Sequence, residues 1–169
     1  MSQDTYNILF LCSANSARSL MAEAIMQREG AGKFTAFSAG SQPAGTPNPN
    51  AMSLLEREDF ASGQFRSKSW DEFASDTAPQ MDFVVTLCDQ AAGETCPVWP
   101  GQPMLAHWGI QDPAKFEGNA AQTAVIFAKA YAQIRNRITA FTNLPIESLD
   151  HLSLKTKMDE IGQMSEDAV

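Results

Sequence analysis

The sequence predicts an α/β protein with a central parallel sheet of about four strands and helices on both faces. Three observations support this prediction. Short apolar runs alternate along the chain with segments of helical periodicity. The run 83–87 is almost unbroken in apolar and β-branched residues, as expected of a strand buried on both faces. Polar segments follow the ends of the apolar runs, where ligands of such sheets collect.

The first half of the chain predicts a strand, helix, strand unit. The strand 6–11 is an apolar run, and the helix 19–28 repeats its apolar residues at helical spacing until glycines end it. The run 34–39 alternates well enough for a second strand, which Gly40 ends. A loop rich in glycine and proline then leads into a helix at 50–58.

The second half continues the same alternation of elements. A polar run at 66–69 is expected to be exposed, and its last serine is placed to cap a short helix at 70–73. Strands are predicted at 83–87 and 104–107, and an amphipathic helix at 122–141. We expect one domain over residues 1–143, followed by a C-terminal extension, 144–169, that is compatible with a second short helix.

The composition excludes several classes of function. The chain has 169 residues and a net charge of -8, so it lacks the basic charge that nucleic-acid backbones require. No stretch approaches the ~20 apolar residues of a membrane helix, and residues 1–5 lack the features of an export signal. We therefore expect a cytoplasmic protein that binds neither nucleic acid nor membranes. The odd cysteine count favours redox or nucleophilic use over a secreted disulfide framework.

The stretch from Cys12 to Ser19 lies in the turn between the first predicted strand and helix. Such a loop turns backbone N–H groups inward, and the helix adds the positive end of its dipole, which together make a cradle for a tetrahedral oxyanion. Arg18 can grip two oxygens of that anion, and this setting favours Cys12 as a thiolate nucleophile. Asn15 tolerates a left-handed backbone, and Ser19 can either donate a hydrogen bond to the sulfur or cap the helix. The residues expected to bind the anion are Ser13, Ala14, Asn15, Ser16, Ala17, Arg18 and Ser19.

Four further segments follow this loop in a recognisable order. They are Phe37-Ser38-Ala39-Gly40, Val84-Val85-Thr86-Leu87-Cys88, Cys96-Pro97 and His107-Trp108-Gly109-Ile110-Gln111-Asp112-Pro113. Together with the loop they resemble the arsenate reductases of the low-molecular-weight protein tyrosine phosphatase fold, of the thioredoxin-coupled type. The resemblance covers residues 6–142 and implies the same fold and an oxidoreductase activity.

The resemblance assigns the role of general acid to Asp112. An oxygen that leaves arsenic or phosphorus needs a proton, which a carboxylic acid opposite the nucleophile can supply. On local sequence alone, an Asp before Pro is equally typical of a turn. Phosphatases that act on phosphotyrosine usually carry an aromatic residue directly after this pair, to stack on the substrate ring. This chain has Ala114 there and its nearest aromatic at Phe116, which favours arsenate over phosphotyrosine.

The cysteines also bear on the choice between an arsenate reductase and a phosphatase, because reduction of arsenate to arsenite needs two electrons from thiols. The resemblance implies that Cys12 attacks arsenate and that Cys88 attacks Cys12, which releases arsenite. Cys96 would then attack Cys88, and thioredoxin or glutaredoxin would reduce the resulting Cys88–Cys96 disulfide. Phosphate or sulfate would compete with arsenate for the loop. From the residues alone, Cys88 and Cys96 could instead be packing cysteines.

Some such reductases hold a potassium ion beside the loop. The matching positions here are Asn15, Glu23, Ser38 and Asp71, and all four carry oxygens that suit a hard cation. The alternative to an ion site is that the charged residues of this set are helix charges exposed to solvent and that the serine belongs to a turn. No other cofactor is expected.

We therefore expect an arsenate reductase that serves arsenic detoxification. Two alternatives stay open: a low-molecular-weight protein tyrosine phosphatase of the same fold, and a non-catalytic oxyanion-binding protein.

Overall fold

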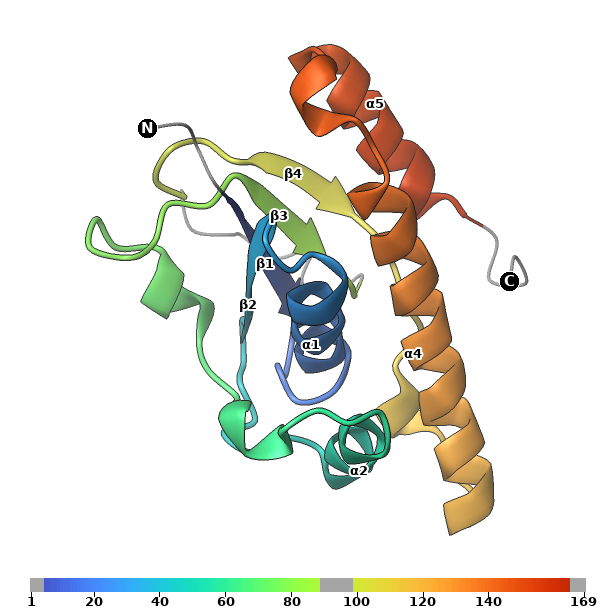
Figure 1. The fold of residues 1–169 in the computed structure, drawn as a ribbon. Coiled ribbons are helices and arrows are strands. Elements are labelled where there is room, and N and C mark those ends of the chain that lie inside the picture. The colour runs from blue at the N-terminus through green and yellow to red at the C-terminus, as the bar shows by residue number, and fades with distance from the viewer. Residues whose placement is uncertain (1–4, 89–98, 165–169) are drawn as a thin grey trace.

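The computed structural model describes residues 5–88 and 99–164, and a four-stranded parallel sheet lies at its centre (Figure 1). The strands are β1 (Tyr6–Cys12), β2 (Phe34–Gly40), β3 (Phe83–Thr86) and β4 (Met104–His107). Their order across the sheet is β2-β1-β3-β4, and every neighbouring pair is parallel. The predicted α/β architecture is confirmed. Because β1 lies between β2 and β3, the carboxyl ends of β1 and β3 are side by side.

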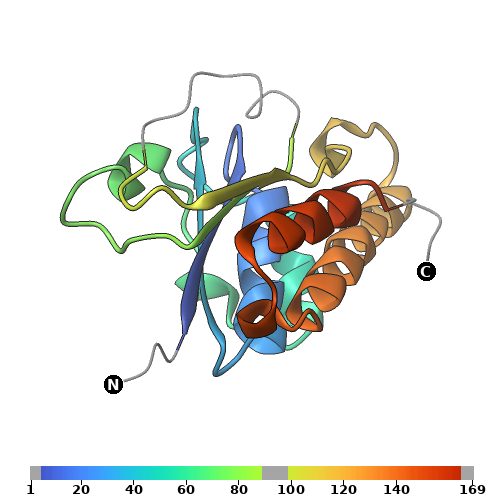
Figure 2. The same cartoon turned by 90° about the horizontal axis from the view of Figure 1, so that it is seen from above.

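The α-helices gather on one side of the sheet, and the short η2 turn lies on the other side (Figure 2). The helices are α1 (Arg18–Glu29), α2 (Pro49–Arg57), α4 (Ala120–Thr142) and α5 (His151–Gly162), and η2 is the 3-10 helix Trp70–Phe73. Capping residues in the local sequence explain where α2, α4 and η2 begin. Asn48 caps α2, whose first residue is a proline, and Asn119 forms a capping box with Gln122 at α4. The predicted cap of η2 by Ser69 is also present.

Both faces of the sheet are covered, which explains the unbroken apolar runs in the sequence. Successive side chains of a strand point to opposite faces. Ile8 and Phe10 of β1 therefore belong to the large core under the helices. Leu9 and Leu11 face the other way and pack in a second core with η2. That second core also contains Trp70, Phe73, Met81, Val84 and Trp99.

The chain after residue 143 folds onto the sheet. α5 buries Leu154, Met158 and Ile161, which join the same core as β1 and α4. The indole N–H of Trp108 donates a hydrogen bond of 3.0 Å to the carbonyl of Met158, so the end of β4 is tied to α5. Within the described ranges, no helix combines the length and apolar character that crossing a bilayer requires.

Candidate active site

The loop from Ser13 to Ala17 connects the end of β1 to the start of α1 and is clamped from outside by residues 41–48. The carbonyls of Cys12, Ser13, Ala14 and Ser16 accept hydrogen bonds of 2.8 to 3.3 Å from N–H groups of that segment. Across a planar trans peptide, each N–H points opposite to the preceding carbonyl. The N–H groups that follow these carbonyls therefore point away from the clamp. This arrangement gives the loop the inward donors that an oxyanion cradle needs.

Asn15 is the residue around which the loop turns. Its backbone is left-handed, with φ of 47°, and its side chain is fully buried. The side-chain amide donates to Ser19 Oγ at 2.7 Å and to Ser38 Oγ at 3.0 Å, while its oxygen accepts the N–H of Lys68 at 2.9 Å. These three bonds stabilise a backbone angle that most residues avoid.

Gly40 lets the end of β2 approach this loop closely. A Cβ at this position would lie 2.4 Å from the carbonyl oxygen of Ser13 and 3.0 Å from the Cβ of Asn15. The first contact requires the backbone to move, and the second requires Asn15 to give way by a few tenths of an ångström. The Phe-Ser-Ala-Gly segment therefore has a steric reason to end in glycine at this position.

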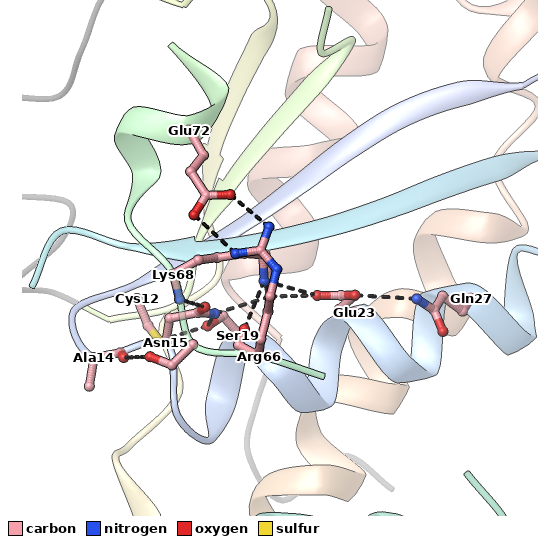
Figure 3. Close-up of polar contacts among 11 residues, drawn as sticks. Cys12, Ala14, Asn15, Ser19, Glu23, Gln27, Arg66, Lys68 and Glu72 are labelled. Atoms are coloured by element: carbon pink, nitrogen blue, oxygen red, sulfur yellow. Dashed lines mark hydrogen bonds and ion pairs between the residues drawn. The ribbon is translucent and has the colours of Figure 1, made fainter. Parts of the chain in front are cut away.

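Cys12 and Ser19 form a buried pair with a 2.9 Å separation between Sγ and Oγ. Of the two roles foreseen for Ser19, the contact with sulfur is the one present, since Ala17 occupies the N-cap position of α1. Asn15 donates to Ser19 Oγ, which leaves the serine proton available to the sulfur (Figure 3). A hydrogen bond from a hydroxyl stabilises a thiolate more than a thiol.

Arg18, the first residue of α1, lies close to Asp112. One guanidinium nitrogen of Arg18 donates to the carbonyl of Ile110 at 2.9 Å, and the other lies 3.5 Å from Asp112 Oδ2. The second carboxylate oxygen of Asp112 accepts the N–H of Ala114 at 3.0 Å, so the acid is held by a local turn. The structure thus brings the predicted clamp and the predicted acid to the same place.

Cys88 follows β3 and lies against Cys12. The two cysteines form a buried cluster of their own, with 2% and 5% of their surfaces exposed. The parallel pairing explains this contact. The N–H of Leu87 donates to the carbonyl of Leu11, so the residues that follow, Cys88 and Cys12, lie beside each other. Ser13 Oγ also lies 3.5 Å from Cys88 Sγ. Cys96, the third predicted thiol, lies outside the described residues.

Three of the four residues matched to a potassium site come together behind the loop. The hydroxyl of Ser38 donates to Glu23 Oε1 at 2.5 Å and accepts from Asn15. Asp71 is exposed on η2, and within the described parts of the chain no hydrogen bond or ion pair joins its side chain to this cluster.

A lysine that the sequence did not single out completes the cluster. The run 66–69 was expected to be exposed, and that expectation is wrong for Lys68, whose side chain is only 8% exposed. Its ammonium lies 3.2 Å from Ser38 Oγ and 3.7 Å from Glu23 Oε1. Figure 3 shows Lys68 and Glu23 in this cluster. A lysine between two serines has no periodicity or motif that would have revealed this burial.

Burial is the largest influence on the two charged groups of this cluster. It raises the pKa of Glu23 above its usual value, and the hydrogen bond from Ser38 and the charge of Lys68 oppose that rise. Burial likewise lowers the pKa of Lys68, and the charge of Glu23 opposes the fall. Each group is therefore stabilised in its charged form by the other.

Comparisons with known proteins agree with this geometry. The sequence matches the low molecular weight phosphotyrosine protein phosphatase family over residues 7–155. The chain therefore belongs to that family. It is 34% identical to the arsenate reductase of Oceanobacillus iheyensis over 134 residues, which span 79% of this chain and 93% of that protein.

Two solved structures are also similar to this chain. The arsenate reductase of Archaeoglobus fulgidus has a TM-score of 0.62 and 26% identity, and the match covers 81% of this chain and 99% of that one. An arsenate reductase in the phosphate binding state has a TM-score of 0.65 and 26% identity, over 81% of this chain and 96% of that one.

Proposed function

We propose that this protein is an arsenate reductase in which Cys12 is the nucleophile and Cys88 the second thiol. The contact between these two buried cysteines is the observation that carries the proposal. A phosphatase needs one thiol at this loop, whereas reduction needs a second thiol within reach of the first. The curated relative named above is an arsenate reductase that aligns over most of this chain, which supports the same activity.

In the first step arsenate binds to the N–H groups of the loop and to Arg18. Cys12 attacks arsenic as a thiolate, a sulfur–arsenic bond forms, and one arsenic–oxygen bond breaks. The departing group is a hydroxyl of the protonated arsenate, which takes one proton from Asp112 and leaves as water. The 3.5 Å separation between Asp112 and Arg18 supports this role, because it places the acid beside the guanidinium that we propose binds the anion.

In the second step the thiolate of Cys88 attacks the sulfur of Cys12. A disulfide forms between the two cysteines, and the sulfur–arsenic bond breaks with its electron pair left on arsenic. Arsenic(V) thereby becomes arsenic(III), and arsenite is released. The two electrons come from the two sulfur atoms, so no metal or organic cofactor is required by the balance of the reaction.

In the third step Cys96 attacks Cys88, which frees Cys12 and leaves a Cys88–Cys96 disulfide for an external dithiol such as thioredoxin or glutaredoxin. This part of the proposal rests on the sequence, since Cys96 lies outside the described residues. We also propose that the protein works in the cytoplasm, where thiol-reducing systems keep such cysteines reduced. Phosphate and sulfate are proposed as competing ligands of the loop.

Phosphatase activity is the second candidate function. The loop, Arg18 and Asp112 are sufficient to cleave a phosphate monoester without Cys88, so we expect a weak side activity on a small aryl phosphate. Ala114 after Asp112-Pro113 offers no ring surface to a phosphotyrosine side chain.

The test is arsenite release with thioredoxin, thioredoxin reductase and NADPH, measured on the wild type and on Cys12→Ser, Cys88→Ser and Cys96→Ser. We expect Cys12→Ser to abolish both arsenite release and aryl phosphate hydrolysis. Cys88→Ser and Cys96→Ser should abolish multiple turnover of arsenate but leave phosphate hydrolysis close to the wild-type rate. Glutaredoxin with glutathione, in a parallel assay, identifies which dithiol serves as reductant.

Two results would decide against the proposal. If Cys88→Ser kept full multiple turnover, the electrons could not come from this pair of thiols. If the wild type released no arsenite yet hydrolysed aryl phosphates, the phosphatase would be the better assignment, and binding of arsenate with neither activity would indicate a non-catalytic oxyanion-binding protein.

A further inference from the structure

The ammonium of Lys68 is surrounded by oxygens in the place where the family resemblance implied a potassium ion. It lies 3.0 Å from the carbonyl oxygen of Arg66, 3.2 Å from Ser38 Oγ and 3.7 Å from Glu23 Oε1. The ammonium donates hydrogen bonds to the first two oxygens and forms an ion pair with the third. The geometry therefore matches the charged form of the side chain.

The same oxygens already have hydrogen-bond or ion-pair partners, and Ser38 Oγ has no lone pair left for a metal ion. Ser38 Oγ accepts from both Asn15 and Lys68 and donates to Glu23, which uses its whole hydrogen-bonding capacity. The side-chain oxygen of Asn15 accepts the N–H of Lys68. A cation that touched Ser38 and Glu23 would lie against the ammonium, where like charges repel. With Asp71 exposed on η2, the four matched residues do not fit a potassium ion.

The backbone of Lys68 is fixed as firmly as its side chain. Its N–H donates to Asn15 Oδ1 at 2.9 Å, and its carbonyl accepts the N–H of Gly40 at 2.9 Å. Residue 68 therefore cross-links the end of β2 to the loop. Through Asn15 the connection continues to Ser19 Oγ and then to the sulfur of Cys12.

We propose that the Lys68 ammonium is a built-in monovalent cation that takes the place of potassium, neutralises Glu23 and positions the anion-binding loop through Ser38 and Asn15. Lys68 is connected to the sulfur of Cys12 through Asn15 and Ser19, so it is a positioning residue. The wild-type protein therefore needs no added potassium for stability or turnover. Removal of the ammonium leaves a buried carboxylate and a space that a potassium or ammonium ion can enter.

The test compares thermal unfolding in potassium chloride, ammonium chloride and choline chloride at one ionic strength, so that general screening is equal. The variant is Lys68→Met, which keeps most of the apolar stem. The control is Lys157→Met, a lysine whose side chain is 51% exposed on α5. A second variant, Glu23→Gln with Lys68→Met, removes the charge that would attract an added cation.

We expect the wild type and Lys157→Met to unfold at the same temperature in all three salts, to within about 1 °C. In choline chloride, the unfolding temperature of Lys68→Met should be about 4 °C or more below that of the wild type. Potassium or ammonium chloride should restore about half of that difference or more. The doubly substituted protein should not respond to potassium. In the arsenite assay, Lys68→Met should need potassium for turnover whereas the wild type should not.

Several outcomes would overturn the inference. The first is a selective stabilisation of the wild type by potassium. The second is a Lys68→Met protein that unfolds at the wild-type temperature or fails to fold even in potassium. The third is a potassium response in the doubly substituted protein that equals the response of Lys68→Met. Only the turnover measurement rests on the proposed function. If no variant releases arsenite but the unfolding results are as expected, the proposed function fails and this inference stands.

Discussion

The side-chain amide of Asn15 lies 2.7 Å from Ser19 Oγ, and Ser19 Oγ lies 2.9 Å from the sulfur of Cys12. Because the amide nitrogen can only donate, the serine proton is left available to the sulfur, and a thiolate at Cys12 can only accept it. All three residues are buried, so water does not compete for these bonds. The nucleophile is therefore held and stabilised by a short chain of bonds within the loop itself.

The first prediction concerns the hydroxyl of Ser19. Ser19→Ala removes the donor to Cys12, and a hydrogen bond to a charged group is worth about 1.5–3 kcal/mol. We expect the alkylation rate of Cys12 by iodoacetamide at neutral pH to fall about tenfold or more, with a similar fall in arsenite release. Ser75→Ala, at an exposed serine, is the control and should change neither rate. An unchanged alkylation rate in Ser19→Ala would show that the sulfur does not depend on this hydroxyl.

The second prediction concerns the close approach of β2 to the loop. Gly40→Ala places a methyl group 2.4 Å from the carbonyl oxygen of Ser13, so the loop has to move. We expect a loss of about 1–3 kcal/mol in the free energy of unfolding and a weaker affinity for phosphate by titration calorimetry. Gly63→Ala is the matched control, because a Cβ there meets nothing within 4 Å. Wild-type phosphate affinity in Gly40→Ala would contradict the proposed cradle.

The third prediction separates proton donation from anion binding at Asp112. Asp112→Asn keeps the shape of the side chain but cannot act as an acid, so we expect the single-turnover rate of arsenite release to fall about 10²–10⁴-fold. Phosphate binding should persist or strengthen, because a negative charge 3.5 Å from Arg18 has been removed. Asp76→Asn, at an exposed surface position, is the control. If the rate of Asp112→Asn matched the wild type, another group would have to supply the proton.

The fourth prediction concerns the role of α5 in stability. Met158 is fully buried and its carbonyl accepts the indole N–H of Trp108, whereas Leu152 on the same helix is 75% exposed. Met158→Ala should lower the free energy of unfolding by about 2–5 kcal/mol. Leu152→Ala should change it by no more than about 0.5 kcal/mol. Urea unfolding of both variants measures the difference, and equal effects would mean that α5 does not share the core of the domain.

The strands and most of the helices could be predicted from the sequence because their signals are local. The run 83–87 and the alternation in 34–39 reflect side chains that point to alternate faces of one sheet. The end of α1 and the cap of η2 likewise depend on residues a few positions away. The burial of Lys68 could not be predicted in this way. Its partners Ser38 and Glu23 lie 30 and 45 positions earlier, and no spacing rule connects them.

By itself the sequence determined the class of fold and the loop that begins at Cys12, because both depend on residue patterns that are local along the chain. The candidate acid at Asp112 came from the family resemblance, since the local sequence fits a turn equally well. Only the tertiary structure decided that Cys88 contacts Cys12 and that an ammonium, rather than an open set of oxygens, lies beside Glu23. The physical reason is the same in both cases. Parallel strand pairing and the return of residues 66–69 to the end of β2 bring distant parts of the chain together, and the fold as a whole sets those distances.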